Sequence, residues 1–207
     1  MPDLLGIVSI GLLILITMII ALKFPEISRV LFVALIVRII FLIINNNLVY
    51  LPDGDMDAIG FEYFAWTFSQ EGFSNVISSF SEPHGWFFIS KIIAIPYALF
   101  GRSMVMAQSI SIFFGIASVF LGWIVAKKLW DNQSAIKVSW SIALFPTLIS
   151  YSVLSMREVY ISFFILLAIF GVVKWARDGG FKSILFVVFG FFAASLFHGA
   201  SIIGLFV

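Results

Sequence analysis

Three carboxylates fall within five residues of the chain, at Asp53, Asp55 and Asp57, close to long apolar stretches. Crowded carboxylates beside an apolar region bind protons more readily than isolated ones, which suits a general base. Their oxygens are also the ligands that hard divalent cations prefer. The alternative is an acidic turn in water whose last member, Asp57, caps the following helix. The spacing therefore predicts either a catalytic base with a cation site at Asp55 and Asp57, or a helix cap.

Two further groups of ionisable residues border apolar stretches. Arg157 and Glu158 lie together between two such stretches, and arginine suits bidentate binding of phosphate. An outer turn at the level of the lipid headgroups would instead keep both charges in water. His84 and Lys91, with Trp86 nearby, suit a lipid phosphate at the membrane interface. Equally, Lys91 could only extend its ammonium to the interface.

Composition decides which class of protein carries these groups. Of 207 residues 62% are hydrophobic and 11% are charged, less than half of the ~25% usual in a soluble domain. This excludes a soluble enzyme and a disordered tail, and the absence of cysteine excludes a disulfide scaffold. A net charge of +1 without a basic stripe excludes a nucleic-acid partner.

A helical membrane span needs roughly 20 apolar residues, and six stretches approach that length. They are residues 4–22, 30–48, 104–126, 136–152, 159–175 and 184–205. We therefore expect an all-α, polytopic transmembrane helix bundle of about six spans, with residues 1–207 forming a single transmembrane domain. The last apolar stretch has no polar exit, so we expect a piece of a longer protein. Arg38 falls inside the second stretch, where we expect it to pair with an outer acid or with the first span.

Charge asymmetry predicts the orientation of these spans. Lysine and arginine residues flank three short turns, and the positive-inside rule assigns those turns to the cytoplasm. They are Lys23, Arg29, Lys127, Lys128, Lys137, Lys174, Arg177 and Lys182. Residues 50–102 then form an extracytoplasmic loop, and Arg157 and Glu158 face the same side.

The predicted outer loop has two apolar segments. Residues 57–71 have helical spacing, with Phe61, Phe64, Ala65 and Phe68 on one side and Glu62, Ser69 and Gln70 elsewhere, which is typical of an amphipathic helix lying on the membrane. Residues 86–100 form an interfacial or re-entrant helix, because a full crossing would reverse the orientation of the later turns.

Together these parts resemble the polytopic glycosyltransferases of the GT-C class, which includes protein mannosyltransferases and the lipid A aminoarabinose transferase. The resemblance covers about residues 30–178. In that class an early outer loop carries a catalytic acid, an aromatic residue four positions later, a small residue eight positions later and a glycine near the helix end. Asp57, Phe61, Ala65 and Gly72 match this pattern. The order continues through residues 99–103, 126–130 and 143–152.

The resemblance implies transfer of a hexosyl group from a polyprenyl-phosphate donor to a glycan, lipid or protein acceptor. Asp57 would be the general base, and Asp55 and Glu158 would orient the acceptor or hold a divalent cation such as Mg or Mn. The other implied substrate-binding residues are Asp53, and Arg157 with Lys91 or His84 at the leaving phosphate. We expect a bacterial or archaeal cytoplasmic membrane with the site facing outside. The alternatives are a polysaccharide polymerase of the O-antigen or exopolysaccharide kind, and a non-enzymatic scaffold or transport subunit.

Overall fold

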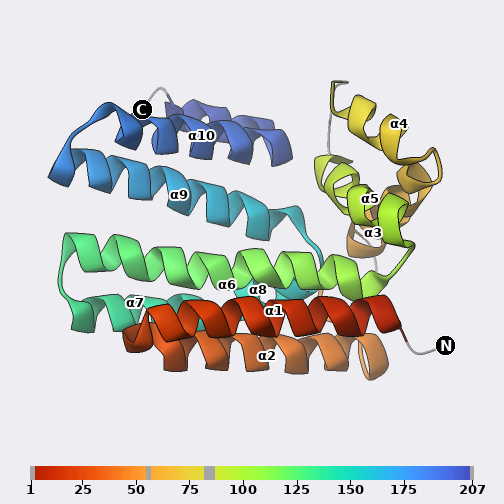
Figure 1. Cartoon of the computed structure of the whole chain (residues 1–207), viewed down its shortest axis with the longest axis horizontal. Coiled ribbons are helices and arrows are strands. Elements are labelled where there is room, and N and C mark those ends of the chain that lie inside the picture. Colours follow the sequence, from red (N-terminus) through yellow and green to blue (C-terminus); the bar gives the residue numbers. More distant parts are fainter. Residues whose placement is uncertain (1–2, 55–56, 82–86, 206–207) are drawn as a thin grey trace.

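The chain is described by a computed structural model over residues 3–54, 57–81 and 87–205, and every regular element in these ranges is helical (Figure 1). This confirms the predicted all-α class. The α-helices are α1 (Leu4–Lys23), α2 (Ser28–Asn47), α3 (Asp57–Ser69), α4 (Phe73–Ser78), α5 (Phe88–Phe100), α6 (Met104–Leu129), α7 (Asn132–Leu144), α8 (Pro146–Val153), α9 (Arg157–Asp178) and α10 (Phe181–Phe197). Short 3₁₀ helices are η1 (Pro25–Ile27), η2 (Ser79–Ser81) and η4 (Gly199–Leu205).

In the described parts of the chain, four helical segments are long and apolar enough to cross a membrane, and five if the bent pair α7–α8 forms one crossing. The four are α1, α2 with η1, α6 and α9. These segments make the chain a membrane protein of the multi-pass kind. The predicted stretch 184–205 forms the shorter α10, of 17 residues, followed by η4. The count of six spans therefore stays a prediction.

The predicted span over residues 136–152 is interrupted. Pro146 has no N–H to donate to the carbonyl four residues earlier, and a residue before proline avoids the helical region. Phe145 accordingly has an extended backbone (φ −67°, ψ 116°), and α7 and α8 meet at a bend of 55°. The span predicted over residues 136–152 is therefore two helices joined at a proline, and a single crossing by the pair stays a prediction.

The long helices lie side by side in two groups (Figure 1). One group packs α1, α2 and α7 against α6 around a core that includes Leu31, Ala34, Ile112 and Val119. On the other side of α6, α9 and α10 form a close pair. A Cβ added at Gly190 would lie 2.6 Å from the carbonyl oxygen of Phe164, so only glycine permits this approach of the two backbones.

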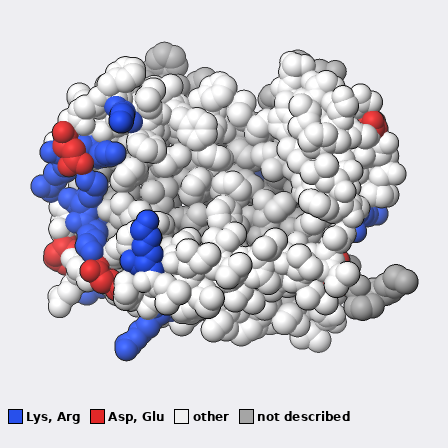
Figure 2. Space-filling view, in the orientation of Figure 1, with Lys and Arg blue, Asp and Glu red and all other residues white. Residues whose placement is uncertain are grey.

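The three turns that carry the predicted basic residues meet at one end of the bundle. Lys127 forms an ion pair with Glu26 of the first turn, and Lys128 forms one of 2.7 Å with Asp178 of the third. Figure 2 shows lysine and arginine gathered at this end, beside a long uncharged face. We call it the basic end; α3, α4 and α5 lie at the opposite end (Figure 1). This arrangement is the one the orientation rule predicts, although which end faces outside stays a prediction.

Candidate functional site

Two charged segments far apart in sequence meet at the end opposite the basic end. The hydroxyl of Tyr151 in α8 donates a hydrogen bond of 3.4 Å to a carboxylate oxygen of Asp53. Asp53 has a left-handed backbone (φ 67°), which aspartate tolerates in turns. A Cβ added at Gly54 would lie 3.1 Å from the side chain of Leu154, so this turn packs directly on the α8–α9 connection. The acidic turn and the segment before Arg157 therefore share one end of the bundle.

Asp57 is the first residue of α3, and its side chain is exposed. The next turn of α3 buries Ala58 and Phe61 in an apolar cluster that also contains Met156 and Val159. Those two residues flank the Arg157–Glu158 pair, so Asp57 and that pair border the same cluster. An anion in the first turn also stabilises a helix through the helix dipole. Both predicted roles of Asp57, catalytic base and helix cap, are compatible with this position.

Arg157 and Glu158 begin α9 and contact each other, with 3.3 Å between Nε and Oε1. Their side chains are 14% and 35% exposed, so the pair lies partly inside the protein. Oε2 of Glu158 is buried without a hydrogen-bond partner in the described parts of the chain. A buried carboxylate oxygen left in this state is costly, so it suits a donor supplied by a ligand.

Ser155 shares these features and was not predicted from the sequence. Its hydroxyl is buried, without a hydrogen-bond partner among the described residues, and its backbone is left-handed (φ 57°). Backbone strain of this kind in a residue other than glycine concentrates at functional sites. A single serine between apolar residues carries no signal in the sequence that would have identified it.

Lys91 in α5 is 5% exposed, and its ammonium donates a hydrogen bond to the carbonyl oxygen of Ser79. It therefore joins α5 to the segment that follows α4. His84 and Asp55 lie outside the described residues. Within the described ranges no three histidine or acidic side chains lie close enough together to hold a metal ion. The cation site at Asp55 and Asp57 thus stays a prediction.

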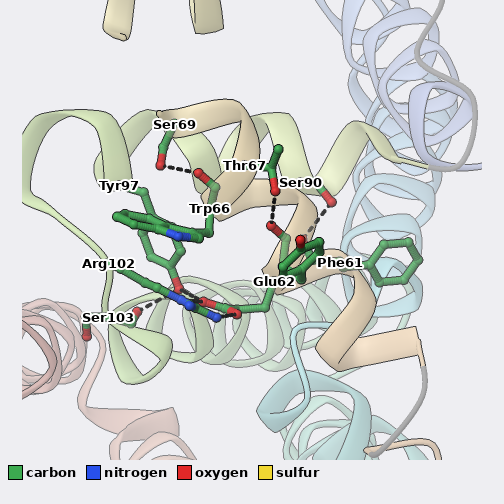
Figure 3. Close-up of polar contacts among 10 residues, drawn as sticks. Phe61, Glu62, Trp66, Thr67, Ser69, Ser90, Tyr97, Arg102 and Ser103 are labelled. Atoms are coloured by element: carbon green, nitrogen blue, oxygen red, sulfur yellow. Dashed lines mark hydrogen bonds and ion pairs between the residues drawn. The ribbon is translucent and has the colours of Figure 1, made fainter. Parts of the chain in front are cut away.

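An ion pair between the buried Glu62 and the exposed Arg102 fixes α3 to its neighbours (Figure 3). Glu62 is 5% exposed and accepts hydrogen bonds from the Tyr97 hydroxyl at 2.9 Å and from Nε and Nη2 of Arg102 at 2.9 and 2.6 Å. Hydrogen bonding to Glu62 raises the pKa of Arg102, while burial, followed by the charge of Glu62, raises the pKa of Tyr97. Tyr97 also contacts the carbonyl oxygen of Ser103, whose hydroxyl donates to Asp3 before α1.

This network corrects the predicted faces of α3. Phe61 and Ala65 are buried as expected, but Phe64 is 38% exposed, and Glu62 is buried with Ser69. Arg102 supplies the charge that makes the burial of Glu62 tolerable. The pair holds α3, and with it Asp57, at a fixed place on the bundle.

The site thus combines an exposed carboxylate, a partly buried arginine–glutamate pair and a strained serine at the margin of an apolar helix bundle. Such groups can accept a proton from a hydroxyl and bind a phosphate. Sequence reasoning found the charged members but missed Ser155 and Tyr151. No protein-family model, curated protein or solved structure matches this chain.

Proposed function

We propose that this chain is a membrane glycosyltransferase, of the kind that the GT-C resemblance implies, which uses a polyprenyl-phosphate sugar as donor. One observation carries the proposal: Asp57 and the Arg157–Glu158 pair border the same apolar cluster at the end opposite the basic end. The positive-inside rule assigns that end to the outside of the membrane. Nucleotide sugars are cytoplasmic, so a transferase acting outside needs a lipid-linked donor.

In the proposed reaction, Asp57 takes the proton of an acceptor hydroxyl. The acceptor oxygen attacks the anomeric carbon, and the bond from that carbon to the phosphate oxygen breaks, so that polyprenyl phosphate leaves with inversion at the sugar. Arg157 neutralises the charge that develops on the leaving phosphate. Oε2 of Glu158, which has no hydrogen-bond partner among the described residues, accepts a hydrogen bond from the acceptor, and Asp53, held by Tyr151, helps to orient the acceptor.

The remaining predicted residues have supporting roles in this proposal. Asp55 would share a divalent cation with Asp57, and His84 or Lys91 would add positive charge near the phosphate. General base catalysis contributes roughly 10²- to 10⁴-fold, so binding and orientation must supply the rest of the rate.

The test is turnover of a labelled polyprenyl-phosphate hexose by membranes that contain the protein. Asp57→Asn should lower turnover by roughly 10²- to 10⁴-fold at an unchanged protein level, because the amide cannot accept the proton. Glu71→Gln is the matched control, since Glu71 is an exposed carboxylate in the same predicted loop. Unchanged turnover in Asp57→Asn would contradict the assignment of the base.

The same assay distinguishes the glycosyltransferase from the alternative, a polysaccharide polymerase. The partial burial of Arg157 favours the polymerase, because a partly buried arginine binds a lipid phosphate better than a fully solvated arginine does. If Arg157→Ala abolishes turnover while Asp57→Asn retains it, the chain is better described as a polysaccharide polymerase. If no variant and no wild-type membrane shows turnover, the scaffold or transport subunit becomes the better description.

A further inference from the structure

A groove of about 490 Å³ lies at the basic end, where α9 leads into α10, away from the proposed catalytic site. Its walls are apolar apart from two ammonium groups. The lining residues are Lys174, Lys182, Leu185, Phe186 and Phe189. A groove with this composition fits a ligand that has an anionic head and an apolar tail.

The residues from α10 form one stripe. Leu185, Phe186 and Phe189 lie three, four and seven residues after Lys182, so all four share one face of the helix. At 1.5 Å per residue the stripe extends roughly 10 Å, from a cation at its start to aromatic side chains further along the helix. The groove therefore begins with a positive charge and continues with apolar side chains along α10, in the same order as the headgroup and acyl chain of a lipid.

Lys174 reaches the same groove from α9. Its ammonium lies 5.3 Å from the ring centre of Phe186 and 5.9 Å from that of Phe170, within the range of cation–π contacts. These two rings hold the ammonium over the start of the groove while leaving its N–H groups available.

The carboxylate of Asp178 interacts electrostatically with Lys174, but it is not ion-paired with either lysine of the groove. In the described parts of the chain neither Lys174 nor Lys182 forms an ion pair, and Asp178 pairs with Lys128 instead. Lys182 also lies in the first turn of α10, where the helix dipole disfavours a cation and favours an anion. Within the described ranges no side chain caps this helix start, whose N-cap is Gly180.

We infer that this groove binds one anionic phospholipid, with the phosphate between Lys174 and Lys182 and an acyl chain along Leu185 and Phe189. Basic pockets between helices at the cytoplasmic side of membrane proteins suit such headgroups, and that leaflet is rich in anionic lipid. The apolar walls favour a lipid over a free anion. A second copy of the chain is a poor occupant, because the excess of basic residues would make two such ends repel each other. This inference does not depend on the proposed glycosyltransferase activity.

The test is native mass spectrometry of the purified chain in detergent, titrated with phosphatidylglycerol or phosphatidylcholine. We expect phosphatidylglycerol to bind at least tenfold more tightly. Lys174→Gln and Lys182→Gln should each weaken its binding about fivefold, the effect of one basic residue near an anionic surface. Lys137→Gln is the matched control, because Lys137 is an exposed lysine at the same end outside the groove. Lys182→Arg should retain binding.

Three results would overturn the inference. If Lys137→Gln weakens phosphatidylglycerol binding as much as Lys174→Gln and Lys182→Gln do, the overall positive charge of this end, rather than the groove, attracts the lipid. Equal affinity for phosphatidylcholine would show a groove that recognises only acyl chains. Displacement of the lipid by millimolar glycerol phosphate would show a site for the free anion. Circular dichroism of each variant checks that helix content is unchanged.

Discussion

Arg38, in the middle of α2, donates a hydrogen bond of 3.0 Å from Nε to the hydroxyl of Ser152 in α8. Its Nη1 donates to the carbonyl oxygens of Ala34 and Ala143, both at 3.1 Å, and the side chain is fully buried. Ala143 lies at the end of α7, where the break at Pro146 disrupts the regular helical hydrogen bonds. Arg38 therefore caps a broken helix from inside the bundle, and the predicted pairing with an outer acid or the first span was wrong.

Replacing Arg38 with methionine should destabilise the fold. The substitution leaves the carbonyl of Ala143 without its donor in an apolar interior, which should lower the free energy of unfolding by about 2–4 kcal/mol. Unfolding in mixed detergent micelles, followed by circular dichroism, measures this difference. Arg29→Met on the same helix is the control, since Arg29 is exposed and its loss should change stability by less than about 0.5 kcal/mol. Equal stability of the two variants would refute the capping role.

The α9–α10 pair depends on Gly190. A Cβ there would lie 2.6 Å from both the backbone nitrogen of Ala168 and the carbonyl oxygen of Phe164, and backbone atoms cannot move aside. Gly190→Ala should therefore cost about 1–3 kcal/mol of stability. The matched control is Gly11→Ala in α1, where nothing lies within 4 Å of the added Cβ and stability should stay the same or rise slightly. Proteolysis between α9 and α10 reports whether the pair has separated.

Apolar runs alone predicted most of the helices. The stretches 4–22, 104–126 and 159–175 each lie within one helix, because about 20 apolar residues have no other stable form in a membrane. The amphipathic segment predicted over residues 57–71 forms α3, which ends at Ser69, and its predicted faces were only partly correct. A period of 3.6 identifies a helix but does not reveal which polar residue will be buried with a distant partner.

Pairings between distant residues explain most of what the sequence did not show. Glu62 is buried because Arg102, 40 positions later, reaches it. Two of the hydrogen bonds of Arg38 go to groups more than 100 positions away, while its Nη2 is buried without a partner among the described residues. The hydroxyl of Ser155, which has no hydrogen-bond partner among the described residues, is placed by a left-handed backbone conformation that the residue type does not predict. The charged candidates Asp53, Asp57 and Arg157 could be predicted, since charge is rare beside apolar spans.

Asp131 gives the start of α7 a dependence on pH. Its carboxylate accepts a hydrogen bond of 2.8 Å from the backbone N–H of Ser134, and this contact holds the pKa of Asp131 below its usual range. Because the folded-state pKa is lower than the unfolded one, the stabilisation is complete above the unfolded pKa. It is lost as the pH falls through the folded pKa.

Asp131→Asn separates the cap from its charge. Asparagine is an equally good N-cap, so this variant should be as stable as the wild type at neutral pH. Its stability should fall less than that of the wild type when the pH is lowered. Asp131→Ala should be less stable already at neutral pH. Thermal unfolding of the three proteins between pH 7 and pH 3 distinguishes these outcomes. An identical acid response in wild type and Asp131→Asn would mean that other carboxylates account for it.

The two ends of the bundle should lie on opposite sides of the membrane. The chain contains no cysteine, so single cysteines can be introduced without a background. Glu71→Cys, near α3 and α4, should react with a membrane-impermeant maleimide in intact cells. Gln133→Cys, in the first turn of α7 at the basic end, should react only after permeabilisation. Both positions are exposed, so burial cannot hide either one.

The labelling pattern bears directly on the proposed donor. Labelling of both positions in intact cells would contradict the opposite placement of the two ends. The reverse pattern, with Gln133→Cys outside, would place Asp57 and Arg157 in the cytoplasm, where nucleotide sugars are available and a lipid-linked donor is not required. It would also move the groove at Lys174 and Lys182 away from the leaflet richest in anionic lipid. The predicted pattern is therefore a requirement for the glycosyltransferase mechanism as proposed, and a physical condition for the lipid site.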